Sequence, residues 1–333
     1  MATIGIPRGF FFDLYYLEWK VFFESLGFDV IPSPETNKVI LDEGIKIGVS
    51  EACISLKLYE GHVAYLVKSG KVDYVFVPRL LSEYPPSAFT LCPKFRGLPD
   101  VVRAALLDMK LPDIVLTANG DWGKRNGRLE FYTKVGLALG KRKRQIKKAF
   151  LDSQEMRRKV LELLLSGYLP IDIRRKLLDG EDVSEPRFDG HLVGILGYPY
   201  LVYDEYITNH IFDRLREVGF SYITADMYEW DELYSILKGL GKPLFWGQSN
   251  KVLAAAMKML KDNRVEGLVS LESYGCGTDA WIGKIIEQEA KGIKPYMELI
   301  LDEQTAEAGM VTRIEAFVDM IMWKEKMAKK GVM

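Results

Sequence analysis

Residues 270–279 read SLESYGCGTD, after an apolar run at 265–269 and before a helical pattern at 281–290. This order predicts a strand, a tight Gly-Cys-Gly turn and a helix, because glycine allows backbone conformations that are closed to other residues. We expect Thr278 or Asp279 to cap the helix, so that the Cys276 sulfur lies near a helix N-terminus, where a thiolate is stabilised. In an open α/β sheet, ligands bind at this edge.

Composition limits the classes of function. The chain has 333 residues, 27% of them charged, and a formal net charge of −1, which argues against a nucleic-acid partner. The length favours two domains. No apolar stretch reaches the roughly 18 residues of a membrane span, and residues 1–8 lack the pattern of a signal peptide. We therefore expect a cytoplasmic protein without a membrane segment.

Strand and helix patterns alternate in the first part of the chain. Strands are predicted at 4–6, 28–31, 47–49, 72–77 and 114–116, and helices at 14–26, 37–46, 54–68 and 99–109. Ser50 is expected to cap the helix at 54–68, which puts Cys53 in its first turn. The alternation indicates an α/β domain over residues 1–118 that carries Cys53 and Cys92.

The strand pattern stops near residue 121 and restarts at 193. We expect a helical bridge and linker over 119–190 and a second α/β domain, carrying Cys276, over 191–333. Strands are predicted there at 193–196, 220–223, 244–246, 265–269 and 297–301, and helices at 204–218, 229–238, 250–262, 281–290 and 312–323. The Leu-Gly-Phe sequence at 26–28 is echoed by Val-Gly-Phe at 218–220, which predicts two domains of similar architecture.

Cys53, Cys92 and Cys276 are the three cysteines of the chain, so they cannot all pair, and a cytosolic setting disfavours disulfides. The simplest alternative is that they are small buried hydrophobic residues. Their contexts favour a shared site, because each follows a predicted strand and has a glycine, a proline or a capping residue beside it. If both sheets turn their carboxyl edges inward, all three sulfurs line the cleft between the domains.

Three thiolates with few histidines suit an iron–sulfur cube better than zinc. Structural zinc takes four ligands, whereas a cube held by three thiolates leaves one iron open to a substrate. The chain has three histidines, His62, His191 and His210, which makes a histidine-rich metal site improbable. His62, within the helix that follows Cys53, is better explained by packing than by acid chemistry.

Charged residues near the cysteine loops have two interpretations. Four basic residues either offset the charge of an anionic cluster or are solvated surface groups: Lys57, Arg79, Lys94 and Arg96. Glu272 and the acidic residues at 302–307 either act as acids or bases or cap helices. The basic run at 141–148 is by default a solvated helix face, with a phosphate-rich ligand or an acidic partner as the alternative.

Several short motifs are spread over nearly the whole chain. They are Ile4-Gly5-Ile6-Pro7-Arg8, Ser33-Pro34 with Thr36-Asn37-Lys38, Glu51-Ala52-Cys53 with Lys57 and Gly61-His62-Val63, Val77-Pro78-Arg79, Cys92-Pro93-Lys94-Phe95 with Gly97-Leu98-Pro99, Tyr274-Gly275-Cys276-Gly277 with Asp279, and Thr305 with the EAGMVTR sequence at 307–313. In combination they make the chain resemble the 2-hydroxyacyl-CoA (2-hydroxyglutaryl-CoA) dehydratase component D family. This family includes double-cubane-cluster proteins and CoA-substrate-specific enzyme activase-related proteins.

The resemblance implies two Rossmann-like (flavodoxin-like) domains with a [4Fe-4S] cluster between them, held by Cys53, Cys92 and Cys276 beside Gly275 and Gly277. It also implies reduction at low potential by a separate ATP-hydrolysing activator that has its own iron–sulfur cluster. The cluster then serves a reductase or a 2-hydroxyacyl-CoA dehydratase. A double cube in one chain takes six cysteines by the family pattern, so three cysteines favour a single cube per chain, with half of a double cube as the alternative.

The candidate catalytic residues are Glu51, Glu272 and Lys57. We expect a homodimer or a heterodimer with a related subunit, a CoA thioester as a candidate ligand, and no nucleic acid or membrane. Residues 302–306 read DEQTA where relatives are expected to have His and Gly, which leaves proton transfer by this loop open. The alternative function is a non-catalytic scaffold or cluster-carrier subunit of such a complex.

Overall fold

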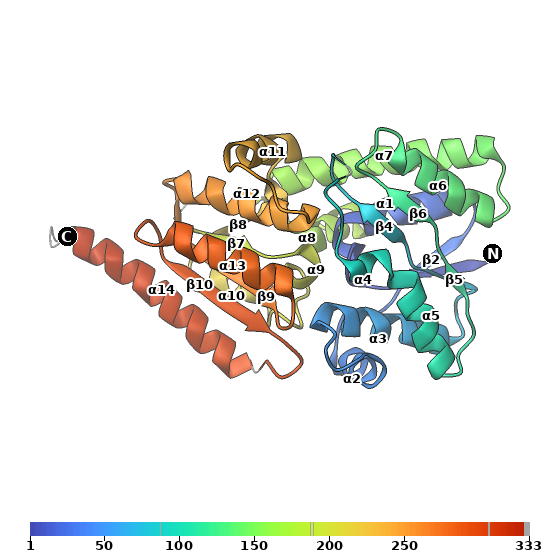
Figure 1. Ribbon diagram of the computed structural model, residues 1–333, viewed down its shortest axis with the longest axis horizontal. Coiled ribbons are helices and arrows are strands. Elements are labelled where there is room, and N and C mark those ends of the chain that lie inside the picture. Colours follow the sequence, from blue (N-terminus) through green and yellow to red (C-terminus); the bar gives the residue numbers. More distant parts are fainter. Residues whose placement is uncertain (87, 187, 189, 306, 330–333) are drawn as a thin grey trace.

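The computed structural model describes residues 1–333 apart from 87, 187, 189, 306 and 330–333, and it confirms the α/β class. Two four-stranded parallel sheets lie side by side with helices around them, and a two-stranded parallel sheet accompanies the first. The first sheet lies on the right of Figure 1 and the second on the left. The two halves meet along the middle of the molecule.

The first sheet has the strand order β2-β1-β3-β5, with all neighbours parallel. Its strands are β1 (Thr3–Ile6), β2 (Asp29–Pro32), β3 (Tyr74–Phe76) and β5 (Val115–Leu116). Its main helices are α1 (Phe12–Ser25), α2 (Lys38–Ile47), α3 (Ile54–Ser69) and α5 (Leu98–Asp108). These elements confirm every strand and helix predicted in the first half except the strand at 47–49.

The second sheet has the order β10-β9-β7-β8 and is also parallel. Its strands are β7 (His191–Leu196), β8 (Phe220–Thr224), β9 (Val265–Ser273) and β10 (Tyr296–Leu301). Its helices include α9 (Pro199–Val202), α10 (Ile211–Glu217), α11 (Trp230–Gly239), α12 (Gly247–Lys261), α13 (Gly277–Ala290) and α14 (Glu307–Lys329). When the four strands of each half are numbered along the chain, both sheets have the order 2-1-3-4, which is the flavodoxin-like arrangement.

Helices dominate the segment between the two sheets, as predicted. They are α6 (Gly127–Ala138), α7 (Lys143–Leu165), α8 (Pro170–Arg174) and the π-helical turn η1 (Arg175–Asp179). Helix α7 runs along the top of Figure 1, packs against α1 and reaches the short helix η2 (Ala225–Met227) of the second half. The segment also returns to the first half, because β6 (Asn119–Asp121) pairs with β4 (Arg79–Ser82). These two short strands were not predicted.

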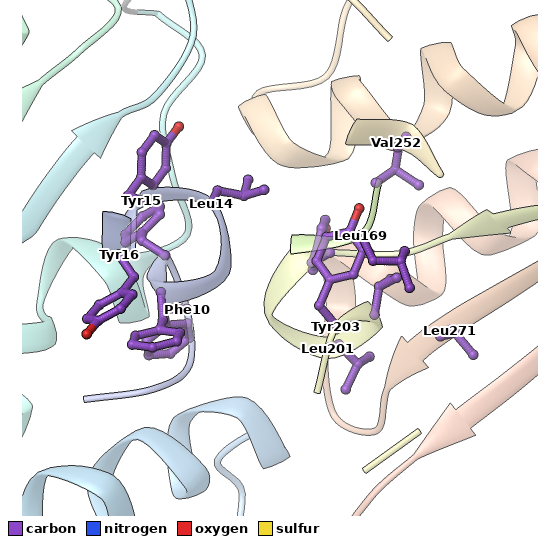
Figure 2. Packing of buried hydrophobic residues seen from close by; sticks show 14 of the residues in the cluster. Phe10, Leu14, Tyr15, Tyr16, Leu169, Leu201, Tyr203, Val252 and Leu271 are labelled. Carbon is purple, nitrogen blue, oxygen red and sulfur yellow. The ribbon is translucent and has the colours of Figure 1, made fainter. Parts of the chain in front are cut away.

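Apolar side chains from both halves form one buried cluster. Figure 2 shows Phe10 and Tyr15 of the first half on one side and Tyr203 and Leu271 of the second half on the other. The Phe10 ring also contacts Tyr200 across the junction, with ring centroids 5.3 Å apart. Burial of apolar surface, and not only chain connectivity, therefore holds the two halves together.

Two predicted strands are wrong for identifiable reasons. Residues 47–49 form no strand, because α2 continues to Ile47 and Gly48 ends it. Residues 244–246 form no strand either, since the Asn250 side chain takes both hydrogen bonds of the Leu244 backbone, each 2.8 Å long. These backbone groups then need no neighbouring strand.

The predicted helix at 204–218 is shortened to α10. Its first part is interrupted at Asn209 and His210, which both adopt the left-handed backbone conformation with φ of 49° and 56°. Such residues end a right-handed helix. In the described part of the chain, no helix is long and apolar enough to span a membrane.

Candidate functional site

Each cysteine stands at the N-terminal cap of a helix. Cys53 precedes α3, Cys92 precedes the short helix α4 (Pro93–Arg96), and Cys276 precedes α13. The expectation that Ser50, Thr278 or Asp279 would cap these helices is wrong, because the cysteines themselves occupy the cap positions with extended backbones. The sulfurs therefore lie beside backbone N–H groups that have no partner within the helix.

The three cysteines line one cavity of about 470 Å³. Cys53 is buried, whereas Cys92 and Cys276 are partly exposed. The first two come from the first half of the chain and the third from the second half, so the cavity lies at the junction of the halves. Gly275 and Gly277 line it too, as does Phe95 of the Cys92 motif. Four further aromatic residues that the sequence did not single out also line it: Phe10, Tyr198, Tyr200 and Trp246.

The glycines beside Cys276 differ in their roles. Gly275 has a φ of 73°, so a tight backbone conformation that favours glycine is confirmed there. Gly277 is the first residue of α13 and is not among the residues with positive φ. A Cβ at Gly277 would meet no heavy atom within 4 Å. Its lack of a side chain leaves open space beside the sulfur.

The thiols of Cys92 and Cys276 favour their protonated form in the absence of a cation. Burial raises the pKa of Cys92, and the N–H groups of Phe95 and Lys94 offset part of that shift. Burial raises the pKa of Cys276 to about 12, and the nearby Asp279 carboxylate adds to the rise. The charge of Cys53 raises the pKa of both other thiols. A metal centre here would have to displace protons from the thiols when it binds.

The spacing of the sulfurs does not match one tetrahedral ion. Two thiolates on one zinc lie roughly 3.8 Å apart, given zinc–sulfur bonds of about 2.3 Å. In the described part of the chain, the group of metal-ligand residues whose ligand atoms all lie within 4.8 Å of one another consists of Glu205, His210 and Asp213. The three cysteines are thus spread more widely than one ion requires, and a larger metal cluster separates its ligands further.

A row of hydroxyl groups ends at the Cys276 sulfur. The Cys276 sulfur lies 3.2 Å from the Thr278 hydroxyl, which lies 2.9 Å from the Tyr198 hydroxyl. The Tyr198 hydroxyl in turn lies 2.7 Å from the Ser249 hydroxyl. All four residues line the cavity. A thiolate can only accept hydrogen bonds, so a deprotonated Cys276 would orient the row with Thr278 donating to it.

Asp279 is a buried carboxyl beside Cys276, although the sequence indicated it as a helix cap. Its side chain is 1% exposed, and its Oδ2 accepts a 3.0 Å hydrogen bond from the Ser273 backbone N–H. Burial raises its pKa to about 7, although Lys94 of the first half opposes the rise. A buried carboxyl that titrates near neutral pH therefore lies next to Cys276.

Gln248 contributes the amide group of the cavity. Its Nε2 donates to the buried Glu83 carboxylate, which also accepts from the Tyr15 hydroxyl. The other end of the amide is Oε1. That oxygen is buried and has no hydrogen-bond donor among the described residues. It is a buried acceptor, without a partner in the part of the chain that the structure describes, in a residue that lines the cavity.

The three candidate catalytic residues do not line the cavity. The Lys57 ammonium is buried and binds Glu303, 2.7 Å away, and the Ser50 carbonyl, 3.1 Å away, so it connects α3 to the loop after β10. The Glu51 side chain is exposed to solvent. The Ser50 hydroxyl and its own backbone lower the pKa of Glu51.

Glu272 lies under helix α13, where a Cβ at Gly283 would collide with its carboxylate. Its side chain is 4% exposed, and Ser270 donates to it over 3.2 Å. Burial, followed by the neighbouring Glu298, raises its pKa to about 9. Glu272 is therefore a neutral carboxylic acid behind the site rather than a group facing the cavity.

Some of the remaining predicted residues line the cavity and others do not. Lys94 lines the cavity, whereas Arg79 pairs with Asp100 over 2.7 Å. His62 is fully buried between the hydroxyls of Ser33 and Thr36, at 3.0 and 3.1 Å. Burial lowers its pKa to about 3, so it is neutral. This environment agrees with the packing interpretation of His62.

Comparison with known proteins identifies a family for this chain. Residues 3–228 match the model of a family described as CoA enzyme activase uncharacterised domain (DUF2229). A search of curated proteins finds no match. Among solved structures, a dinucleotide forming acetyl-coenzyme A synthetase 1 from Ca. Korarchaeum cryptofilum, in complex with phosphate and ADP, is 12% identical with a TM-score of 0.21. The alignment covers 90% of this chain and 56% of the synthetase chain, so the present chain spans little more than half of that protein.

Proposed function

The chain belongs to the CoA enzyme activase uncharacterised domain family, and from that premise we propose that it is an iron–sulfur protein acting in low-potential electron transfer. Cys53, Cys92 and Cys276 would hold one [4Fe-4S] cluster between the two halves. An ATP-hydrolysing activator with its own cluster would supply electrons. The protein would then act either as a reductase of its substrate or in the dehydration of a 2-hydroxyacyl-CoA. The observation that carries the proposal is that three distant cysteines line one cavity.

The chemistry of the donor set supports this choice. Thiolates are the usual ligands of iron–sulfur clusters, and three of them leave one iron of a cube open. When bound, such a cluster supplies one electron at a time. The helix N-termini at Cys53, Cys92 and Cys276 favour negative charge, which stabilises thiolate ligands.

The other cavity residues would bind substrate and exclude water. Phe10, Tyr200 and Trp246 give the cavity aromatic walls, which favour an apolar part of a ligand. The Gln248 side chain also lines the cavity and adds a polar group to these walls. The Thr278 hydroxyl, 3.2 Å from Cys276, can donate to the sulfur and so stabilise its negative charge.

Iron and acid-labile sulfide analysis of anaerobically purified protein, with electron paramagnetic resonance of the reduced sample, tests the proposal. We expect about four irons per chain and the signal of a reduced [4Fe-4S] cluster. Serine at any one of the three cysteine positions should lower the iron content, with unchanged far-ultraviolet circular dichroism. Intact anaerobic protein without iron, before and after reconstitution, would reject the proposal.

The second candidate function is a non-catalytic scaffold or cluster carrier. The observation that favours it is that Glu51, Glu272 and Lys57 do not line the cavity, so none of the candidate acids and bases faces the space that the cysteines share. In that case Cys276→Ala would leave complex formation with an activator intact. Neither the wild-type complex nor the variant complex would show turnover. Loss of turnover in Cys276→Ala, from a wild-type complex that turns over a CoA thioester, would favour the enzyme instead.

A further inference from the structure

A second pocket, of about 210 Å³, lies on the other side of Tyr200 from the cysteine cavity. Arg8 and Arg174 line it, and both guanidinium groups lie over the ring of Phe12, with Cζ atoms 4.9 and 5.2 Å from its centroid. The two cations come from distant parts of the chain. Arg8 follows β1, and Arg174 ends α8.

Each guanidinium is held in place by a hydrogen bond from one of its nitrogen atoms. The Arg8 Nε donates to the Ser33 carbonyl over 3.0 Å, and Arg174 Nη1 donates to Asp13 over 2.8 Å. Glu35 is 3.8 Å from Arg8, which is too long for a hydrogen bond. Most N–H groups of the two guanidiniums thus have no acceptor in the described part of the chain. Two fixed forks with unused donors are a typical recognition device for a planar anion.

The two arginines repel each other inside the pocket, although nearby carboxylates offset part of their charge. Burial lowers the pKa of Arg8, and the charge of Arg174 lowers it further. This means that the two cations repel each other where water screens them poorly. Asp13 is already paired with Arg174, and the Glu35 side chain is 70% exposed. An anion between the guanidiniums would relieve their repulsion.

The pocket also has surfaces for the rest of a ligand. Ile171 and Tyr203 give it apolar walls, and Asp204 and Glu205 line it as well. Asp204 accepts hydrogen bonds from Thr36, at 2.6 Å, and from the Ile207 N–H, at 3.1 Å. An inorganic anion would leave the apolar walls unused, whereas an organic acid would cover them.

From this geometry we propose that the Arg8–Arg174 pocket binds a small organic carboxylate, whose oxygens accept hydrogen bonds from the two guanidinium forks. The space corresponds to roughly seven water molecules of about 30 Å³ each, which suits a molecule of a few carbon atoms. If the ligand also carries an ammonium group, Asp204 and Glu205 are the carboxylates that can pair with it. The site contains no cysteine, so it does not depend on the cluster.

Isothermal titration calorimetry of the full chain with propionate, alanine and inorganic phosphate tests the proposal. We expect saturable binding of propionate or alanine and weaker binding of phosphate. A preference for alanine would assign its ammonium to Asp204 and Glu205, and a preference for propionate would assign an uncharged tail. Absence of saturable binding of both organic acids at tens of millimolar, or tighter binding of phosphate, would overturn the proposal.

Matched variants locate the binding. Arg174→Lys keeps a charge beside Asp13 but loses the planar fork, and Arg8→Lys does the same on the other side. Each should weaken carboxylate binding at least about tenfold. Arg103→Lys, in a surface ion pair with Asp113, should bind like the wild type. Equal affinity in all three variants would contradict the proposal.

The variant Cys276→Ser distinguishes failure of the proposed cysteine site from failure of the proposed carboxylate site. That variant should bind the carboxylate with wild-type affinity even if it holds no iron. Thermal unfolding of each variant shows whether it is folded, and Arg8→Lys provides an independent variant if Arg174→Lys does not fold.

Discussion

The two pockets on either side of Tyr200 have opposite chemistry. The cysteine cavity has aromatic walls, three thiols and a row of hydroxyls, whereas the Arg8–Arg174 pocket has two guanidiniums and several carboxylates. Both pockets draw residues from both halves of the chain. The comparison shows that a single junction can hold a cavity lined by thiols and hydroxyls beside a pocket lined by charged groups, with the Tyr200 side chain lining both.

The largest expected difference between the pockets is in iron binding. Cys276→Ser should reduce the iron content of anaerobically reconstituted protein to less than about a quarter of the wild-type value, because two thiolates hold a cube poorly. Arg174→Lys should leave the iron content unchanged. Equal iron in wild type and Cys276→Ser would show that the metal binds elsewhere.

Removing the Tyr200 ring, which lines both pockets, should join them. The Tyr200 ring packs against Phe10 and Phe95, with centroids 5.3 Å away in both cases. We expect Tyr200→Ala to lower the free energy of unfolding by about 2 to 4 kcal/mol, because it leaves a cavity. Alkylation of the metal-free thiols by iodoacetamide should become faster.

Tyr200→Phe is the control for the loss of the Tyr200 ring. It keeps the ring, so both the stability and the alkylation rate should stay close to those of the wild type. Identical alkylation rates in wild type and Tyr200→Ala would mean that the ring does not limit access to the thiols.

Asp204, which lines the Arg8–Arg174 pocket, and Asp279, which lies beside Cys276, both have a raised pKa, and the two should titrate at different pH. Burial raises the pKa of Asp204 to about 6 and that of Asp279 to about 7. Unfolded aspartate has a pKa of about 3.9. The folded state therefore holds the proton more tightly, and each group lowers the stability as the pH rises from about 4 through its folded pKa.

Asparagine at either position removes this effect. The stability of metal-free Asp204→Asn relative to the wild type should improve between pH 4 and about 6, and that of Asp279→Asn should improve up to about 7. Urea unfolding at a series of pH values measures both curves. A stability difference that is independent of pH would contradict the raised pKa values.

The smallest effect concerns the hydroxyl row at Cys276. Thr278→Val removes the donor 3.2 Å from the sulfur while keeping the shape of the side chain. A hydrogen bond of about 1 kcal/mol to the reduced centre corresponds to roughly 40 mV, so the midpoint potential should become more negative by about that amount. Potentiometric titration followed by electron paramagnetic resonance measures the shift.

Tyr203→Phe is the matched control for the hydroxyl row. Its hydroxyl is also buried, but it bonds Thr224 and Asp226 and does not face the cysteine cavity. The midpoint potential should not change in this variant. An equal shift in Thr278→Val and Tyr203→Phe would show that general destabilisation, and not the contact with the sulfur, is responsible.

Much of the fold could be predicted from the sequence, because most strands are short apolar runs bounded by glycine or proline. The strand before Cys276, the glycine at 275 and the helix after it follow from local patterns alone. Strands β4 and β6 did not, since a three-residue strand such as Asn119–Asp121 carries no periodicity. The false strand at 244–246 depended on a side chain, Asn250, that lies six residues away.

The cysteine loops were visible in the sequence, but the rest of the site was not. Tyr198 could have been found, because it follows strand β7 as Cys276 follows β9. The orientation of Glu272 could not be inferred, since β9 is buried on both faces and its alternation gives no direction. The contact between Thr36 and Asp204 joins residues 168 positions apart, and no local pattern indicates such a pair.

The central claim is that sulfurs from both halves of the chain hold one metal core. The iron X-ray absorption spectrum of anaerobically reconstituted wild-type protein tests it most directly. We expect sulfur as the nearest neighbour of iron, with other iron atoms next, and loss of this spectrum when Cys53, Cys92 and Cys276 are all replaced by serine. Nearest neighbours of nitrogen or oxygen, or the same spectrum in the triple variant, would contradict it.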